Sequence, residues 1–300
     1  LIEPFDGTVY DPCCGSGGMF VQAAKFIEAH GGNTKAVNVY GQESEPATYR
    51  LAKMNLAIRG ISYHLGDRAI STFSDDQHKE LKFDYIMANP PFNLKKYAEY
   101  GGFETDPRWQ SYGIPPTSNA NYAWIQHMIC SMSSGKGRMA VVMPQGILFR
   151  GNQEAEIRKQ LVESDLIEAV VTLGDKLFYG TGLSPCFLII RRMKQAHHSG
   201  RILMIDGSKI LTQKRAQNIL EENDIDRLYS LYQNYSDEED YSRIVTLQEI
   251  RDKEYNLSPN RYVVYHKEEI RPYVEVLAEF KQAYEDVKRL EKEFSLLINA

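Results

Sequence analysis

One short segment carries the clearest chemical signal in this sequence: Asn89-Pro90-Pro91-Phe92, which directly follows an apolar run. The prolines fix the backbone and remove two N–H donors, so the Pro90 carbonyl points in a set direction beside the Asn89 side-chain carbonyl. Two acceptors held in this way suit an exocyclic NH₂ group, whose lone pair is otherwise delocalised into its ring. Their hydrogen bonds favour the pyramidal nitrogen, which can attack a cationic methyl donor while Phe92 stacks on the ring. A rigid turn between strand and loop is the alternative interpretation.

A glycine-rich segment, residues 11–18, reads Asp-Pro-Cys-Cys-Gly-Ser-Gly-Gly. Glycines in a turn before a helix let a ligand approach the backbone N–H groups at the helix N-terminus. The segment fits a pyrophosphate cradle, an adenosyl pocket or a plain tight turn. Asp11 argues against pyrophosphate, because a carboxylate repels phosphate and suits a cationic ligand.

Two more acidic residues follow the next two expected strands. Glu43 comes after residues 37–41, and an acid at this place in nucleotide-binding sheets accepts hydrogen bonds from ribose hydroxyls. A solvated loop residue is the other interpretation. Asp67 follows residues 62–65, where its carboxylate either accepts a hydrogen bond from an adenine amino group or belongs to a simple Gly-Asp turn.

The elements that must position these residues alternate between strand and helix. We expect strands at residues 8–10, 37–41, 62–65, 83–88, 138–143, 166–173, 184–191 and 201–205. We expect helices at residues 19–29, 46–59, 122–132 and 154–163. This order predicts an α/β fold with a doubly wound, mostly parallel sheet and flanking helices. No clear helix separates the strands at 166–173 and 184–191, so the sheet is expected to be mixed.

Three parts are expected along the chain: a catalytic domain at 1–206, a mostly helical extension at 207–268, and a long amphipathic helix at 269–300. The apolar residues of the last part recur at steps of three and four, which is the seam of a helix that packs on another surface. That seam either folds back on its own domain or docks on a partner. Its residues are Ile270, Tyr273, Leu277, Phe280, Tyr284, Val287, Leu290, Phe294 and Leu297.

Composition sets limits on the function. The chain has 300 residues, 43% hydrophobic and 25% charged, which is ordinary for a globular protein. A net charge of −5 argues against a stand-alone nucleic-acid binder, but not against a nucleic-acid enzyme held by a partner or by a local basic patch. The apolar runs are too short to span a bilayer, so we expect a soluble cytoplasmic protein. The four cysteines show neither a disulfide framework nor zinc spacing, and no metal is expected.

Residues 11–18 and 89–92, in this order, resemble the amino-group (N6-adenine) DNA methyltransferases. Further stretches narrow the resemblance, over roughly residues 7–265, to the modification subunit of type I restriction–modification systems: 40–43 with 47–52, 119–127, 146–151 and 177–182. The resemblance implies a Rossmann-like class I S-adenosylmethionine-dependent methyltransferase fold. It further implies a flipped-out adenine of double-stranded DNA as substrate, with a specificity subunit and a restriction subunit as partners.

The same resemblance implies roles for the candidate site residues. The cofactor-binding set is Asp11, Pro12, Gly15, Ser16, Gly17, Gly18, Glu43 and Asp67, with Glu43 at the ribose and Asp67 near the adenine ring. The catalytic set that holds the target adenine is Asn89, Pro90, Pro91 and Phe92. The family also carries a helical domain and a cofactor-binding segment before the glycine loop. Because this chain begins at Leu1, without Met and shortly before Asp11, we expect both to be missing.

Two other functions stay open. Asn-Pro-Pro-aromatic segments also occur in methyltransferases that act on protein glutamine or on RNA bases, although the stretches at 119–127 and 177–182 argue against both. A non-enzymatic assembly or DNA-positioning subunit with a degenerate cofactor site is the third hypothesis, and the intact segment 89–92 argues against degeneracy.

Residues 93–120 carry glycines, prolines and aromatics and are expected to form a loop. With Lys95, Lys96, Arg108 and Trp109, this loop either contacts DNA phosphate or is exposed and flexible.

Overall fold

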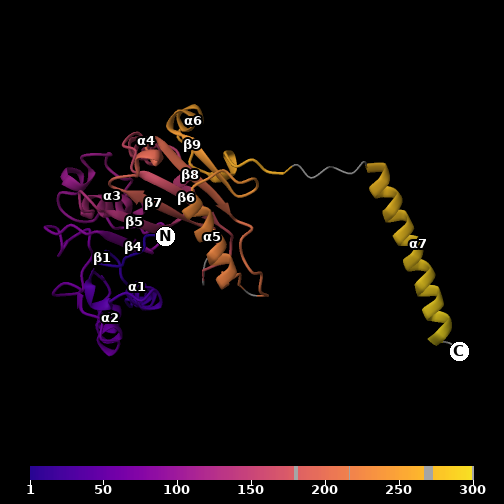
Figure 1. Ribbon diagram of the computed structural model, residues 1–300, viewed down its shortest axis with the longest axis horizontal. Helices are drawn as coiled ribbons and strands as arrows, with labels where there is room; N and C mark the ends of the chain where they lie inside the picture. The colour runs from indigo at the N-terminus through magenta and orange to yellow at the C-terminus, as the bar shows by residue number, and fades with distance from the viewer. Residues whose placement is uncertain (179–181, 216, 267–272, 299–300) are drawn as a thin grey trace. The chain divides into compact units, whose positions relative to one another are not determined.

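A nine-stranded sheet organises the computed structural model, which describes residues 1–300 except 179–181, 216, 267–272 and 299–300 (Figure 1). The strands are β1 Gly7–Asp11, β2 Val37–Gly41, β3 Tyr63–His64, β4 Tyr85–Ala88, β5 Arg138–Pro144, β6 Ile167–Leu173, β7 Pro185–Arg191, β8 Arg201–Gly207 and β9 Ser242–Thr246. The α-helices are α1 Gly18–Ala29, α2 Pro46–Ile58, α3 Asn121–Ser131, α4 Gln153–Glu163, α5 Glu222–Asn234, α6 Leu247–Asp252 and α7 Tyr273–Ile298.

The strand order is β3-β2-β1-β4-β5-β7-β6-β8-β9. From β3 to β5 all neighbours are parallel, whereas β7 runs antiparallel between β5 and β6. The predicted mixed, mostly parallel sheet is confirmed. The direction in which the strands are added reverses between β1 and β4, and ligands of open α/β sheets bind outside the carboxyl ends of the strands at such a point. The ends of β1, β2 and β4 therefore mark the place to look for a site.

Burial on both faces holds the central strands in place. Val9 and Tyr10 are neighbours in β1 and point to opposite faces, yet both are completely buried. Val9 belongs to an apolar cluster with α1 and α2, which includes Leu56. Tyr10 stacks on Phe83 with 4.3 Å between ring centroids, in a second cluster with α3. Helices thus cover both faces of the sheet, as the alternation of strand and helix predicts.

The segment after β8 differs from its predicted helical character. It contains α5 and α6, but also β9, which pairs antiparallel with β8. The sequence of β9, Ser-Arg-Ile-Val-Thr, is short and has no clear alternation of polar and apolar residues, so pattern reasoning does not find it. One compact unit spans Leu1–Val264, which includes this strand.

The second unit, Tyr265–Ala300, contains α7. The predicted apolar seam lies along this helix. Leu277 is half-buried, whereas the other described side chains of the seam are exposed, with Phe280 at 67% and Phe294 at 64%. Ile270 lies outside the described residues, and the side chain of Leu297 is likewise not described. No described helix is both long and apolar enough to cross a membrane.

Candidate active site

The glycine loop joins the end of β1 to the start of α1. Gly15 and Gly17 have φ angles of +55° and +77°, in the left-handed region that side chains disfavour. The Cys14 N–H donates to the Gln42 carbonyl at 2.9 Å, which anchors the loop to the end of β2. A Cβ atom on Gly15 or Gly18 would meet nothing within 4 Å, so both glycines face open space. The backbone is therefore open to a ligand at the N-terminus of α1.

Asp11 lies beneath this loop and is only 2% exposed. Its carboxylate accepts a hydrogen bond from the Cys13 N–H at 3.0 Å. Burial, with a smaller contribution from the charge of Glu43, raises the pKa of Asp11 to about 7, against the opposing effect of the Cys13 hydrogen bond. A carboxylate that is desolvated in this way is stabilised by a cationic ligand.

Glu43 connects the ends of β1 and β2. One carboxylate oxygen accepts from the Gly15 N–H at 3.0 Å, and the other accepts from the Glu45 N–H at 2.8 Å, at the start of α2. The structure thus brings Glu43 to the glycine loop. A carboxylate has further lone pairs beyond these two bonds, so the predicted ribose contact is compatible with them.

Asp67 lies farther along the same edge, after β3, and its side chain is exposed. The N–H groups of Asp67 and Arg68 donate to the Gln77 side-chain oxygen at 2.7 and 3.3 Å. The Gln77 side-chain nitrogen donates back to the Arg68 carbonyl at 2.8 Å. Gln77 therefore holds the backbone of the turn, while the contact of Asp67 with an adenine ring stays a prediction.

The segment 89–92 leaves the sheet at the end of β4, next to β1 in the sheet. Pro90 is buried, Asn89 is exposed and Phe92 is half-buried. Phe178, from the loop after β6, lies edge to face with Phe92 at 6.3 Å between ring centroids. Phe178 belongs to the stretch 177–182, but the sequence alone suggests no role for it. Residues 179–181 of that stretch lie outside the described residues.

Three segments converge just after Phe92. Asn93 has a φ angle of +53°, and its backbone N–H donates to the Asn121 side-chain oxygen at 3.0 Å. The Asn121 side-chain nitrogen donates to the Asn93 side-chain oxygen, and Arg150 donates to the same oxygen, both at 3.0 Å. This clasp, Asn93–Asn121–Arg150, joins the segment 89–92 to α3 and to the stretch 146–151. Pattern reasoning missed it; its only signal was that the stretches 119–127 and 146–151 belong to the family resemblance.

The loop at 93–120 needs a correction. Trp109 is 2% exposed, and the Arg108 side chain is 13% exposed and ion-paired with Asp106. The interpretation as an exposed loop is wrong for these two residues, because aromatic rings and internal hydrogen bonds enclose them. Lys95 and Lys96, in contrast, are exposed. Among the described residues, no group of three or more His, Cys, Asp or Glu side chains is placed to hold a metal ion.

The chain is similar to known proteins of one family. The family model "N-6 DNA Methylase" matches residues 1–270. The HindI methylase subunit, a type I restriction enzyme subunit of Haemophilus influenzae, is 40% identical over 88% of this chain and 60% of its own length. The MjaIX methylase subunit of Methanocaldococcus jannaschii is 36% identical over 100% of this chain and 55% of its own. The chain thus spans between half and two thirds of the length of these relatives.

Solved structures of related proteins have a similar fold. The methyltransferase subunit of a type I restriction–modification system from Streptococcus thermophilus superposes with a TM-score of 0.76 at 31% identity, over 85% of this chain and 54% of that one. The EcoKI M protein shares the fold with a TM-score of 0.67 at 19% identity, over 96% of this chain and 69% of that one. The fold is that of class I S-adenosylmethionine-dependent methyltransferases, and the chain belongs to the N-6 DNA methylase family.

Proposed function

We propose that this chain is the catalytic part of the modification subunit of a type I restriction–modification system, and that it methylates the N6 amino group of adenine in DNA. The observation that carries the proposal is the position of the segment 89–92. It leaves β4 beside the glycine loop, which follows the neighbouring strand β1. An amino-group site and a cofactor site therefore share one edge of the sheet. Membership of the N-6 DNA methylase family and the relatives named methylase subunits support the proposal.

The residues at this edge fit S-adenosylmethionine. That molecule has a cationic methionine part, a ribose diol and an adenine ring, and when bound it supplies an electrophilic methyl group. The buried carboxylate of Asp11 matches the cationic part, and Glu43 supplies an acceptor for the ribose. Gly15 and Gly18 leave room at the N-terminus of α1, while Asp67 is exposed at the end of β3. Pro12, Ser16 and Gly17 complete the loop.

The catalytic segment has one task, which is to bind and orient the target amino group. The Asn89 side-chain carbonyl and the Pro90 carbonyl accept its two hydrogens, and Pro91 keeps this backbone rigid. Phe92 and Phe178 offer aromatic surfaces for the base once it has left the DNA stack, which offsets part of the unstacking energy of a few kcal/mol. The clasp holds the position of Phe92 through Asn93.

We infer the partners from the net charge of the chain and from the apolar seam of α7. A chain with a net charge of −5 has by itself little attraction for DNA phosphate. We therefore assign recognition of the DNA sequence to a specificity subunit. The exposed apolar seam of α7 is the proposed docking element for that subunit, and the restriction subunit completes the complex. Modification of the host's own DNA puts this complex in the cytoplasm.

The direct test is to map the methylated base. The protein is incubated with S-adenosylmethionine, double-stranded DNA and its specificity subunit, and the DNA is analysed for N6-methyladenine. We expect site-specific N6-methyladenine with the wild-type chain and none with Asn89→Ala. Methyl transfer to a protein glutamine or to RNA, with none to DNA, would overturn the proposal.

A further inference from the structure

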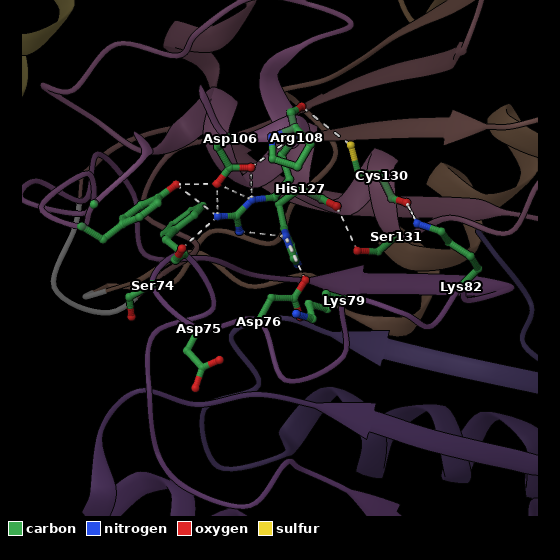
Figure 2. Close-up of a pocket in the computed structure, with 14 residues that line it drawn as sticks. Ser74, Asp75, Asp76, Lys79, Lys82, Asp106, Arg108, His127, Cys130 and Ser131 are labelled. Atoms are coloured by element: carbon green, nitrogen blue, oxygen red, sulfur yellow. Dashed lines mark hydrogen bonds and ion pairs between the residues drawn. The ribbon is translucent and has the colours of Figure 1, made fainter. Parts of the chain in front are cut away.

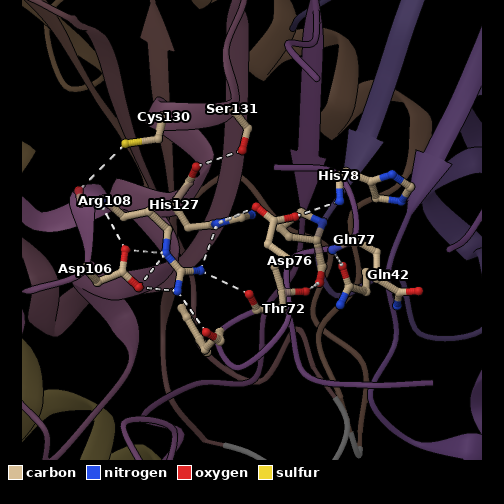
Figure 3. Close-up of polar contacts among 12 residues, drawn as sticks. Gln42, Thr72, Asp76, Gln77, His78, Asp106, Arg108, His127, Cys130 and Ser131 are labelled. Carbon is tan, nitrogen blue, oxygen red and sulfur yellow. Dashed lines mark hydrogen bonds and ion pairs between the residues drawn. The ribbon is translucent and has the colours of Figure 1, made fainter. Parts of the chain in front are cut away.

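A cavity of about 550 Å³ lies outside the two segments described above, between residues 73–82, residues 100–108 and α3 (Figure 2). Its wall carries a polar cluster of Asp76, Asp106, Arg108 and His127 (Figure 3). Lysines and carboxylates are mixed around the cavity, which gives no single charge for a ligand to match. The cluster is therefore better understood by what it holds together.

Arg108 is the centre of this cluster. Its Nε and Nη2 donate to the Asp106 carboxylate, at 2.9 and 2.5 Å. Two further donations reach backbone carbonyls: Nη1 donates to Thr72 at 3.0 Å, and Nη2 donates to Phe73 at 2.8 Å. Nη2 also donates to the Tyr100 hydroxyl at 3.1 Å. One guanidinium thus fixes the segment around Thr72 to the loop that follows the catalytic segment, and a planar fork is the side chain suited to this.

The segment around Thr72 is in turn tied to the cofactor side. The Thr72 hydroxyl donates to the Pro12 carbonyl at 2.6 Å, and Thr72 is 2% exposed. Gln42, fully buried at the end of β2, donates to the carbonyls of Ile70 and Asp75 at 3.1 and 2.7 Å. A continuous chain of hydrogen bonds therefore runs from Arg108 through Thr72 to the glycine loop.

We propose that Arg108 is a positioning residue for the cofactor loop, acting through Thr72 on Pro12 and thereby coupling the substrate-side loop 93–120 to the cofactor site. This inference rests on the proposed function, because it takes S-adenosylmethionine as the ligand of that loop. A lysine keeps the charge but cannot reach the Asp106 carboxylate and two carbonyls at once. Valine at position 72 keeps the shape of threonine and removes only the hydroxyl that binds Pro12.

The test compares Arg108→Lys, Thr72→Val and the double variant with the wild-type chain. Arg191→Lys is the matched control, because Arg191 is 14% exposed and pairs with the buried Glu168, away from the glycine loop. Calorimetry measures S-adenosylmethionine affinity, and amide hydrogen exchange of residues 13–18 is measured without cofactor. We expect each single variant to weaken binding roughly tenfold and to speed exchange in the loop. The double variant should be little weaker than either single one, because both changes break the same route.

The outcomes separate the two proposals. If the full-length wild-type protein does not bind S-adenosylmethionine, the proposed function fails and this inference fails with it. If the wild-type chain binds while Arg108→Lys or Thr72→Val keeps wild-type affinity and loop exchange, this inference alone is overturned. Fully additive losses in the double variant, or an equal loss in Arg191→Lys, overturn the route through Thr72. Thr72→Val gives a decision even if Arg108→Lys does not fold.

Discussion

The buried carboxyl group of Asp11 should destabilise the cofactor-free chain at neutral and alkaline pH, and Asp11→Asn should relieve this. Burial raises the Asp11 pKa from 3.8 to about 7, whereas the unfolded chain keeps an ordinary aspartate. Between these two values the folded state binds more protons than the unfolded state, so the free energy of unfolding falls as pH rises and levels off above pH 7. An asparagine retains an oxygen for the Cys13 N–H and never ionises.

The size of the Asp11 pKa shift determines how much stability the ionised side chain costs. At about 1.4 kcal/mol per pKa unit, the full penalty has a ceiling of roughly 4 kcal/mol above pH 7. At pH 5 only the ionisation of the unfolded chain contributes, and the penalty is roughly 1.5 kcal/mol. The stabilisation by Asp11→Asn should therefore grow by roughly 2 to 3 kcal/mol between pH 5 and pH 8. The same change should weaken S-adenosylmethionine binding, because the neutral amide loses its attraction for the cationic part of the cofactor.

Urea unfolding followed by tryptophan fluorescence measures this directly, because Trp109 and Trp124 are both buried in the unit that contains Asp11. Asp75→Asn is the control, since the Asp75 side chain is 42% exposed and its ion pair with Arg68 should contribute less than about 1 kcal/mol. A stability gain from Asp11→Asn that is the same at pH 5 and pH 8 would refute the reasoning, because it would mean that Asp11 ionises in the folded chain as easily as in water.

Three more predictions concern the site and α7. Asn89→Ala or Phe92→Ala should lower methylation on the order of 100-fold or more while circular dichroism stays unchanged; near-normal turnover in a folded variant would remove that residue from the mechanism. Glu43→Ala should weaken S-adenosylmethionine binding more than DNA binding, because it loses the ribose acceptor and the bond to Gly15; unchanged calorimetric affinity would make Glu43 a bystander. Deletion of α7 should leave cofactor binding intact and abolish co-purification with the specificity subunit, whereas wild-type yield of the complex would show that α7 is not the docking element.

Much of the fold could be predicted from the sequence because its elements carry strong local patterns. The predicted strand at 37–41 is β2 as observed, and the predicted helix at 46–59 is α2 with one residue fewer. The order of the strands within the sheet was harder to predict from the sequence. The sequence indicates a mixed sheet, but only the pairing of β7 with both β5 and β6 places the antiparallel strand in its interior. That pairing joins residues far apart in the chain, which local periodicity does not reveal.

The residues of the candidate site likewise fall into those that the sequence could predict and those that it could not. Residues with a proposed role in ligand binding, such as Asp11, Glu43 and Asn89, can be picked out because each stands at the end of a predicted strand. Residues that hold the site together bind backbone carbonyls, as the side chains of Gln42 and Thr72 do. In the sequence, such a residue cannot be told from any other polar residue in a loop. Their partners are set by the tertiary fold alone.

Arg108 is a residue of this second kind. A basic residue beside a tryptophan in a long loop looks like a DNA contact, yet the guanidinium here is enclosed by Asp106 and by the carbonyls of Thr72 and Phe73. Burying a cation is unfavourable unless its donors are satisfied, and here Asp106 of the same loop and the carbonyls of Thr72 and Phe73 satisfy them. The Thr72 hydroxyl in turn donates to the Pro12 carbonyl of the glycine loop. A loop that only covered DNA would have no need to bury its arginine. The position of Arg108 therefore favours a loop whose order depends on the cofactor loop, so that both halves of the site form together.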